Sequence, residues 1–268
     1  MTFLAADIEV APEVVASFQA DGHAVVRGLA TADELVEVGP IIRRLGVEHA
    51  YDTRPMEERD TYGKAFLQSF NLWRIDPVVA DFVRSPRFAR VAATLLSCEG
   101  VRLYHDQGLF KEPFGGPTPW HQDQYYWPFE DVPTITMWMP MVDVPAEVGS
   151  MTFASGSHLD RALRGPGISD ESQTAFAEQL RQSGLPLATH GAMAAGDATF
   201  HAGWTVHSAG GNPTDTMRAV MTVIYVADGA RVASTLTPAQ DFDRKVWLGG
   251  RKPGELVDHE LNPRLWPI

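Results

Sequence analysis

The sequence WHQDQ places two potential metal ligands, His121 and Asp123, two positions apart, and another histidine, His207, follows far downstream. Two imidazoles and one carboxylate on one face of an iron ion leave three adjacent coordination positions free. This is the arrangement of non-haem Fe(II) oxygenases. In an extended strand, residues i and i+2 point to the same side, so His121 and Asp123 could hold one ion while Gln122 faces away. The pair is therefore a candidate metal site.

The spacing of His121 and Asp123 does not by itself require a metal site. A chain with nine histidines contains such pairs by chance, and most of them are surface residues or satisfied hydrogen-bonding groups. The neighbouring residues favour the metal site, because PW precedes the pair and YYWPF follows it. Aromatic side chains line small-molecule pockets, although any single one is more often an ordinary core residue. Their crowding beside two candidate ligands predicts a pocket.

The composition indicates a globular protein. The chain has 268 residues, of which 44% are hydrophobic and 21% charged, a size and balance typical of one all-β barrel or sandwich domain. The net charge, 22 − 34 = −12, argues against nucleic acid or an anionic membrane as a partner. We expect a small-molecule substrate and a monomer or homodimer.

The cellular location follows from cysteine usage and from the apolar runs. A single cysteine, Cys98, excludes an intrachain disulfide and is typical of a reducing compartment. The first residues lack the pattern of a secretory signal peptide, and no apolar run has the length of a membrane span. These features predict a cytoplasmic protein.

The first 100 residues predict a helical framework packed on a β-rich core. Thr31 and Glu34 have the spacing of a capping box, which should start a helix that ends near Leu45. The charged and polar stretch 51–62 indicates a mobile loop. Further helices are predicted at 11–20 and 86–98, and shorter extended segments at 23–27 and 65–73.

The pattern changes to strands from residue 101, and we expect the core to extend to about 228. The hydrophilic stretch 155–190 is interpreted as a lid inserted between strands, with a helix over about 170–183 that Ser169 or Asp170 could cap. The tail 229–268 has no pattern from which elements can be predicted. The predicted strands are 101–111, 134–141, 149–153, 198–201 and 217–226, all within one domain spanning 1–268.

Three segments together resemble the phytanoyl-CoA dioxygenase family over about residues 12–228: WHQD at 120–123, GSMTF with GSH at 149–158, and FHAGWTVH at 200–207. Members of that family are Fe(II)- and 2-oxoglutarate-dependent oxygenases. The resemblance implies a mainly β fold with flanking helices and a double-stranded β-helix core, which is jelly-roll and cupin-like.

The resemblance also implies roles for individual residues. His121, Asp123 and His207 would bind Fe(II), and Arg218 would bind the distal carboxylate of 2-oxoglutarate, a role that suits the planar, bidentate guanidinium. Trp127 matches an aromatic residue beside the iron site. Two further residues, Gln107 and His105, lie on a strand that often supplies a polar contact to the co-substrate.

The chain departs from the family at one position. Many relatives have a serine two residues after the distal histidine, where this chain has Ala209. Either Ser208 or Thr205 replaces that contact to 2-oxoglutarate, or the contact is missing. His201 is interpreted as a structural residue or a neighbour of the ligands rather than as a fourth ligand.

The reaction that the resemblance implies consumes O2 and 2-oxoglutarate, and it hydroxylates an unactivated C–H bond of a small metabolite or natural-product intermediate. The carboxylate of Asp123 favours hydroxylation over halogenation, because halogenating relatives have a small residue there. Desaturation or cyclisation by the same oxidant, a non-oxidative metal-dependent isomerase, and a binding protein without activity are the alternatives. The candidate substrate-binding residues are Gln68, Asn71, Tyr125 and Trp204.

Overall fold

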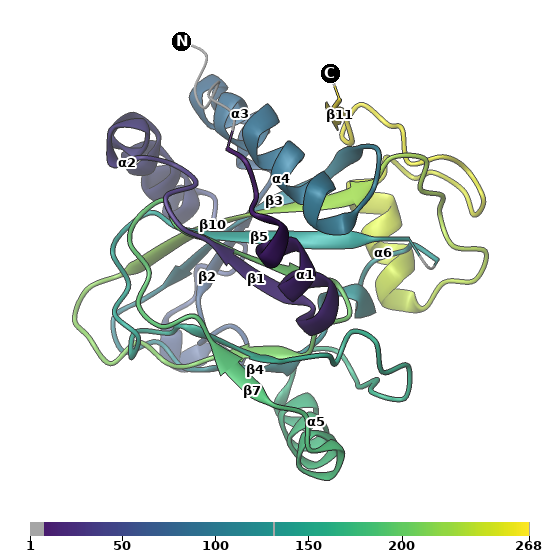
Figure 1. Ribbon diagram of the computed structural model, residues 1–268. Coiled ribbons are helices and arrows are strands. Elements are labelled where there is room, and N and C mark those ends of the chain that lie inside the picture. Colours follow the sequence, from purple (N-terminus) through teal and green to yellow (C-terminus); the bar gives the residue numbers. More distant parts are fainter. Residues whose placement is uncertain (1–7, 131, 268) are drawn as a thin grey trace.

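The computed structural model describes residues 8–130 and 132–267, and two curved antiparallel sheets form its centre (Figure 1). The larger sheet has seven strands in the order β1-β8-β5-β10-β3-β11, with β2 also paired to β3. The smaller sheet has four strands in the order β4-β9-β6-β7. This arrangement confirms the predicted mainly β fold with a jelly-roll core.

The larger sheet takes strands from most of the chain. Its members are β1 (His23–Val26), β2 (Leu67–Phe70), β3 (Val101–Lys111), β5 (Thr134–Pro140), β8 (Ala198–Ala202), β10 (Arg218–Ala227) and β11 (Arg264–Trp266). The smaller sheet consists of β4 (Thr118–His121), β6 (Met151–Ala154), β7 (Leu187–Thr189) and β9 (His207–Ala209). Because β1, β2 and β11 lie outside residues 101–228, the core uses more of the chain than the strand pattern predicted.

Four helices come from the first hundred residues, and the apolar sides of all four share one core with the larger sheet. They are α1 (Pro12–Asp21), α2 (Ala32–Glu48), α3 (Pro77–Val83) and α4 (Pro86–Leu96). Three of them pack against the sheet, whereas α3 packs against α2. The Thr31 side chain accepts a hydrogen bond from the Glu34 N–H, and the Glu34 carboxylate accepts one from the Thr31 N–H, which confirms the predicted capping box of α2. Of these helices, α3 was not predicted.

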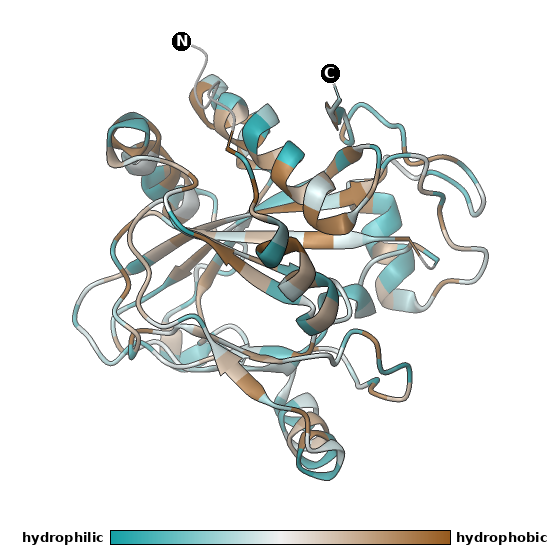
Figure 2. Ribbon diagram, viewed as in Figure 1, coloured by the Kyte–Doolittle hydropathy of each residue, from teal (hydrophilic) through white to brown (hydrophobic). Residues whose placement is uncertain are grey.

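Two more helices lie at the edges of the core. The predicted helix α5 (Asp170–Ser183) begins after Ser169, whose hydroxyl accepts from the Ser172 N–H, and it contacts β4 of the smaller sheet. Its mostly polar surface contrasts with the apolar sides of the sheet-covering helices (Figure 2). The unpredicted helix α6 (Pro238–Trp247) lies in the tail. Across the described ranges 8–130 and 132–267, no helix is long and apolar enough to cross a membrane.

Candidate metal centre and cavity

A cavity of about 780 Å³ lies between the two sheets. Alternate residues of the central strands face it, as the two-residue period of a strand requires. His105, Gln107 and Leu109 of β3 and Thr222 and Ile224 of β10 belong to its wall. The wall therefore combines polar and apolar side chains, while intervening residues such as Phe110 and Val223 belong to the core that the sheet shares with the helices.

His121, Asp123 and His207 come together in this wall. His121 ends β4, His207 begins β9, and the two are register partners in the smaller sheet. Asp123 begins the short 3₁₀ helix η3 (Asp123–Tyr125) directly after β4. One ligand atom from each of the three residues lies within 4.8 Å of the others, which is close enough for all three to contact one metal ion.

The hydrogen bonds of the two histidines leave a nitrogen of each ring available. His121 Nδ1 donates to the carbonyl of Pro119 at 2.8 Å, and His207 Nδ1 donates to the carbonyl of Thr205 at 3.0 Å. The Nε2 atoms lie 3.5 and 3.8 Å from Asp123 Oδ1. A ligand histidine whose other ring N–H is held by a carbonyl is the usual arrangement in metal sites. The donor set therefore fits a ferrous ion.

Burial also keeps the His207 ring uncharged, which is the form that binds a metal. Burial lowers the pKa of His207 well below its ordinary value, and the nearby His121 and His201 add to this effect. At neutral pH the ring is then uncharged and keeps a lone pair. His201 is not one of the three residues whose ligand atoms converge: its Nε2 lies 3.1 Å from Asp123 Oδ2, and its ring packs beside that of His207 with centres 4.3 Å apart. This agrees with its interpretation as a neighbour of the ligands.

Arg218 is a buried cation in the same cavity. Its Nη1 donates to the carbonyl of Gly149 at 2.8 Å, and its guanidinium lies 5.3 Å from the centre of the Trp138 ring. Within the described part of the chain its Nε has no hydrogen-bond partner, and no carboxylate lies within ion-pair distance. Burial lowers the pKa of Arg218 to about 9, so the group is charged at neutral pH. A buried charge without a partner favours binding of an anion.

Four more of the predicted residues lie in the cavity wall: Gln68, Gln107, Trp127 and Ser208. The Gln68 side chain donates to the Gln107 side chain at 3.0 Å, so these two amides act as a pair. His105, the alternative to Gln107 on β3, also faces the cavity.

The structure places Asn71 and Thr205 outside the cavity wall. Asn71 follows β2 with a positive φ of 51°, and its side chain accepts a hydrogen bond from Trp73 Nε1. The Thr205 hydroxyl is fully buried and donates to the carbonyl of Gly22 at 2.8 Å. Of the two candidates to replace the family serine, only Ser208 therefore lines the cavity.

Tyr125 and Trp204 also lie outside the wall. The 3₁₀ turn at η3 directs Tyr126, rather than Tyr125, into the cavity, and the two rings pack edge to face with their centres 4.9 Å apart. The Trp204 ring is covered by the Arg164 guanidinium at 3.8 Å. Neither residue lines the cavity, so their role as substrate contacts stays a prediction.

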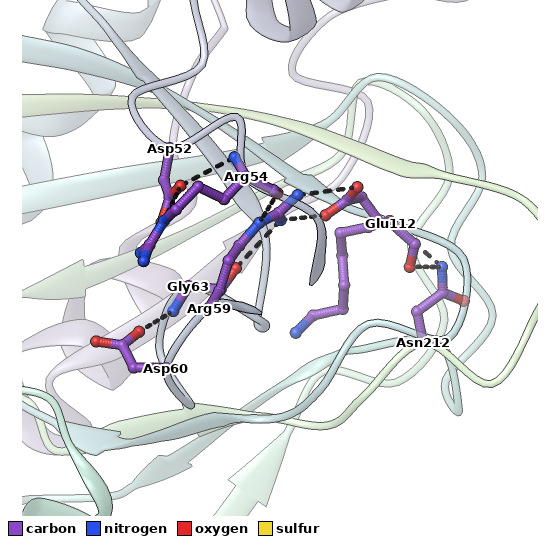
Figure 3. A network of polar contacts seen from close by, with 8 residues as sticks. Asp52, Arg54, Arg59, Asp60, Gly63, Glu112 and Asn212 are labelled. Carbon is purple, nitrogen blue, oxygen red and sulfur yellow. Dashed lines mark hydrogen bonds and ion pairs between the residues drawn. The ribbon is translucent and has the colours of Figure 1, made fainter. Parts of the chain in front are cut away.

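The loop from Tyr51 to Phe66 covers part of the cavity, which the sequence did not reveal. Arg59 is almost fully buried; it donates to Glu112 at 2.5 Å and to the Arg54 carbonyl at 2.7 Å, which ties the loop to the end of β3 (Figure 3). The aromatic residues Tyr51, Tyr62 and Phe66 within this charged stretch were the signal that could have identified it.

The predicted lid, 155–190, contributes only Ile168 to the described cavity wall, so its role as a lid stays a prediction. Helix α6 contributes four residues: Phe242, Asp243, Val246 and Trp247. Part of the cavity wall thus comes from the tail, for which no element was predicted.

Comparisons with known proteins agree with this geometry. A family model described as phytanoyl-CoA dioxygenase (PhyH) matches residues 18–220. The chain is 25% identical over 243 residues to an ectoine dioxygenase from Stutzerimonas stutzeri (strain A1501), covering 82% of this chain and 78% of that protein.

Two solved structures from nogalamycin biosynthesis are also similar. The non-heme alpha ketoglutarate dependent carbocyclase SnoK is 23% identical with a TM-score of 0.78, covering 95% of this chain and 96% of that one. The epimerase SnoN, in complex with Fe3+, alpha ketoglutarate and nogalamycin RO, is 28% identical with a TM-score of 0.77, covering 94% and 97%.

Proposed function

The chain belongs to the phytanoyl-CoA dioxygenase family of Fe(II)- and 2-oxoglutarate-dependent oxygenases, and on this basis we propose that it hydroxylates an unactivated C–H bond of a small metabolite or natural-product intermediate. The observation that carries the proposal is the presence of two complementary features in one cavity. Three converging metal donors and an unpaired, buried Arg218 together match a ferrous ion and a dicarboxylic acid.

His121, Asp123 and His207 would hold the iron. When bound, it supplies O2 activation, the oxidative decarboxylation of 2-oxoglutarate to succinate and CO2, and the oxidation of the substrate. Arg218 would receive the far carboxylate of 2-oxoglutarate in its planar fork.

Polar and apolar side chains would complete the co-substrate space. Ser208 and the paired amides of Gln68 and Gln107 offer hydrogen bonds at the cavity wall. Trp127 and Trp138 present apolar rings there, and both are buried. A dry wall of this kind keeps water away from reactive species during turnover.

A second candidate is epimerisation, ring closure or desaturation by the same iron chemistry. The likeness to the epimerase SnoN, which extends over 94% of this chain at 28% identity, supports it. Hydroxylation stays the first candidate because the ectoine dioxygenase is a relative over most of the chain. A non-oxidative isomerase is the third possibility and needs neither O2 nor 2-oxoglutarate.

The test is a succinate-release assay across amino acids, acyl-CoAs and natural-product scaffolds, with product masses measured for each substrate that couples. Hydroxylation adds one oxygen atom, ring closure or desaturation removes two hydrogens, and epimerisation leaves the mass unchanged. The variant Asp123→Ala should lose both iron binding and succinate release. Undiminished turnover in this variant, or turnover of the wild type without O2, would contradict the proposal.

A further inference from the structure

Asp243 is a second unpaired charged group in the cavity. It lies on α6, is 8% exposed and forms part of the cavity wall. Its Oδ2 accepts a hydrogen bond from the Tyr104 hydroxyl at 2.9 Å. In the residue ranges that the structure covers, no lysine, arginine or histidine lies within ion-pair distance of this carboxyl group. Like Arg218, it therefore lacks a counter-charge from the protein.

Aromatic rings surround this end of the cavity. The Trp247 ring lies 5.0 Å from the ring of Phe70 and 5.0 Å from that of His105, and Phe242 adds a fourth ring to the wall. His105 Nδ1 is buried and has no hydrogen-bond partner among the described residues. The faces of such rings carry negative electrostatic potential, which attracts cations.

Asp243 and Arg218 lie toward opposite ends of the same strands. Arg218 is the register partner of Lys111 on β3, whereas Asp243 is bonded to Tyr104 of that strand. The seven residue steps from Tyr104 to Lys111 correspond to about 23 Å of extended chain. A co-substrate anchored at Arg218 therefore leaves the Asp243 end of the cavity to the substrate.

We propose that the α6 end of the cavity is a subsite for a cationic amino group of the substrate. The Asp243 carboxylate pairs with this amino group, and the rings of Phe70, Trp247 and Phe242 surround it. The inference rests on the proposed function in one respect, namely that the substrate occupies this cavity. A carboxylate inside an aromatic cage is the usual recognition site for ammonium groups. The net charge of −12 also favours the approach of a cation.

The test uses two probes of the same shape, choline and its uncharged analogue 3,3-dimethyl-1-butanol. Each is titrated by calorimetry at pH 8 into the full chain loaded with Fe(II) and 2-oxoglutarate without O2. We expect choline to bind at least about tenfold more tightly than the alcohol. Equal affinities for the two probes would overturn the proposal, because they would show that the carboxyl group acts as a neutral hydrogen-bonding group.

Two variants test whether Asp243 causes the preference for choline over the alcohol. Asp243→Asn keeps the shape and an acceptor for Tyr104, and it should bring the two affinities together. The matched control is Asp241→Asn on the same helix, since Asp241 is partly exposed to solvent and paired with Arg244 and Lys245. This control should keep the preference. A preference that persists in Asp243→Asn, or that disappears equally in Asp241→Asn, would contradict the assignment.

A thermal unfolding measurement shows whether Asp243→Asn folds. If it does not fold, a third variant is used. Trp247→Leu keeps the carboxylate but removes one ring together with its hydrogen bond to Asp243, so it should weaken choline binding more than binding of the alcohol. Repeating the wild-type titrations without iron and 2-oxoglutarate separates the two proposals. A choline preference there, in a protein that releases no succinate with any substrate, would refute only the oxygenase chemistry.

Discussion

Thr136 and His201 are register partners on β5 and β8, and both donate to the same oxygen of Asp123. The Thr136 hydroxyl is 2.8 Å and His201 Nε2 is 3.1 Å from Asp123 Oδ2. The other oxygen, Oδ1, faces His121 and His207, which are register partners in the smaller sheet. A residue pair of the larger sheet thus faces Oδ2, and a residue pair of the smaller sheet faces Oδ1. Together they fix the orientation of the carboxylate between the sheets.

The first prediction concerns this support of the carboxylate. Thr136→Val keeps the shape of the side chain and removes its hydrogen bond, so only His201 still holds Oδ2 of Asp123 and the carboxylate is oriented less firmly toward the metal position. Loss of such a hydrogen bond to a ligand lowers metal affinity by about 10- to 100-fold. We expect an anaerobic Fe(II) titration to show a loss in this range. Thr199→Val is the control, because Thr199 is buried on β8 but makes only a weak contact, 4.0 Å to Met151 sulfur. Equal iron affinity in both variants would contradict the role of Thr136.

The second prediction concerns co-substrate binding. Arg218→Lys keeps the positive charge but loses the planar fork, so it should raise the KM for 2-oxoglutarate by about 30-fold or more. Fe(II) affinity should stay unchanged, because Arg218 is not among the three metal donors. In the control Arg102→Lys, the substituted arginine pairs with Asp228 away from the cavity wall. A rise in KM in Arg102→Lys, or no rise in Arg218→Lys, would refute the assignment.

Much of the fold could be predicted because its signals are local. The capping boxes at Thr31 and Ser169 and the alternating residues of 101–111 need only the residues that form them. Helix α6 had a similar signal that was overlooked. Thr237 and Gln240 form a capping box, with Pro238 in the first turn of the helix.

The remainder of the site depends on tertiary structure. The metal donors belong to recognisable motifs. In contrast, the direction of the Tyr125 side chain depends on a single 3₁₀ turn, and that of the Asn71 side chain on the positive φ of Asn71 itself. Neither feature follows from residue type. Likewise, the approach of α6 to Tyr104 joins positions 139 residues apart, and no local pattern specifies such a contact.

The third prediction concerns close packing of α2 on β3. A Cβ added to Gly46 would lie 1.9 Å from Cε2 of Phe110, a fully buried ring. Alanine favours a helix over glycine by about 0.5–1 kcal/mol, but overpacking a core costs about 1–3 kcal/mol. We therefore expect Gly46→Ala to lower the free energy of unfolding, as measured by urea denaturation.

A double-mutant cycle tests the cause of that loss. Phe110→Leu removes the ring atoms that the new methyl group would meet, so the double variant Gly46→Ala/Phe110→Leu should lose less stability than the sum of the two single variants. Additive losses would mean that Gly46 is required for another reason.

The fourth prediction is the pH dependence of choline binding at the α6 end of the cavity. Burial raises the pKa of Asp243 to about 7, although hydrogen bonds from Tyr104 and Trp247 oppose the shift. The group is therefore neutral below pH 7 and negative above it. Since choline has no titratable ammonium proton, its affinity should fall about tenfold for each pH unit below the pKa of Asp243 and level off above it.

The other titratable groups that face Asp243 keep their charge between pH 5 and 9. Burial raises the pKa of Tyr104 well above its ordinary value and that of Tyr126 to about 12, and it lowers the pKa of His105 to about 4. Burial also brings the pKa values of Asp106 and Lys111 to about 7, so the variant Asp243→Asn is needed to assign a midpoint in this range. Because a bound cation favours the carboxylate, the midpoint in the complex should lie lower than in the free protein. In Asp243→Asn the pH dependence should disappear, and a midpoint near pH 7 that persists in this variant would assign the titration to another group.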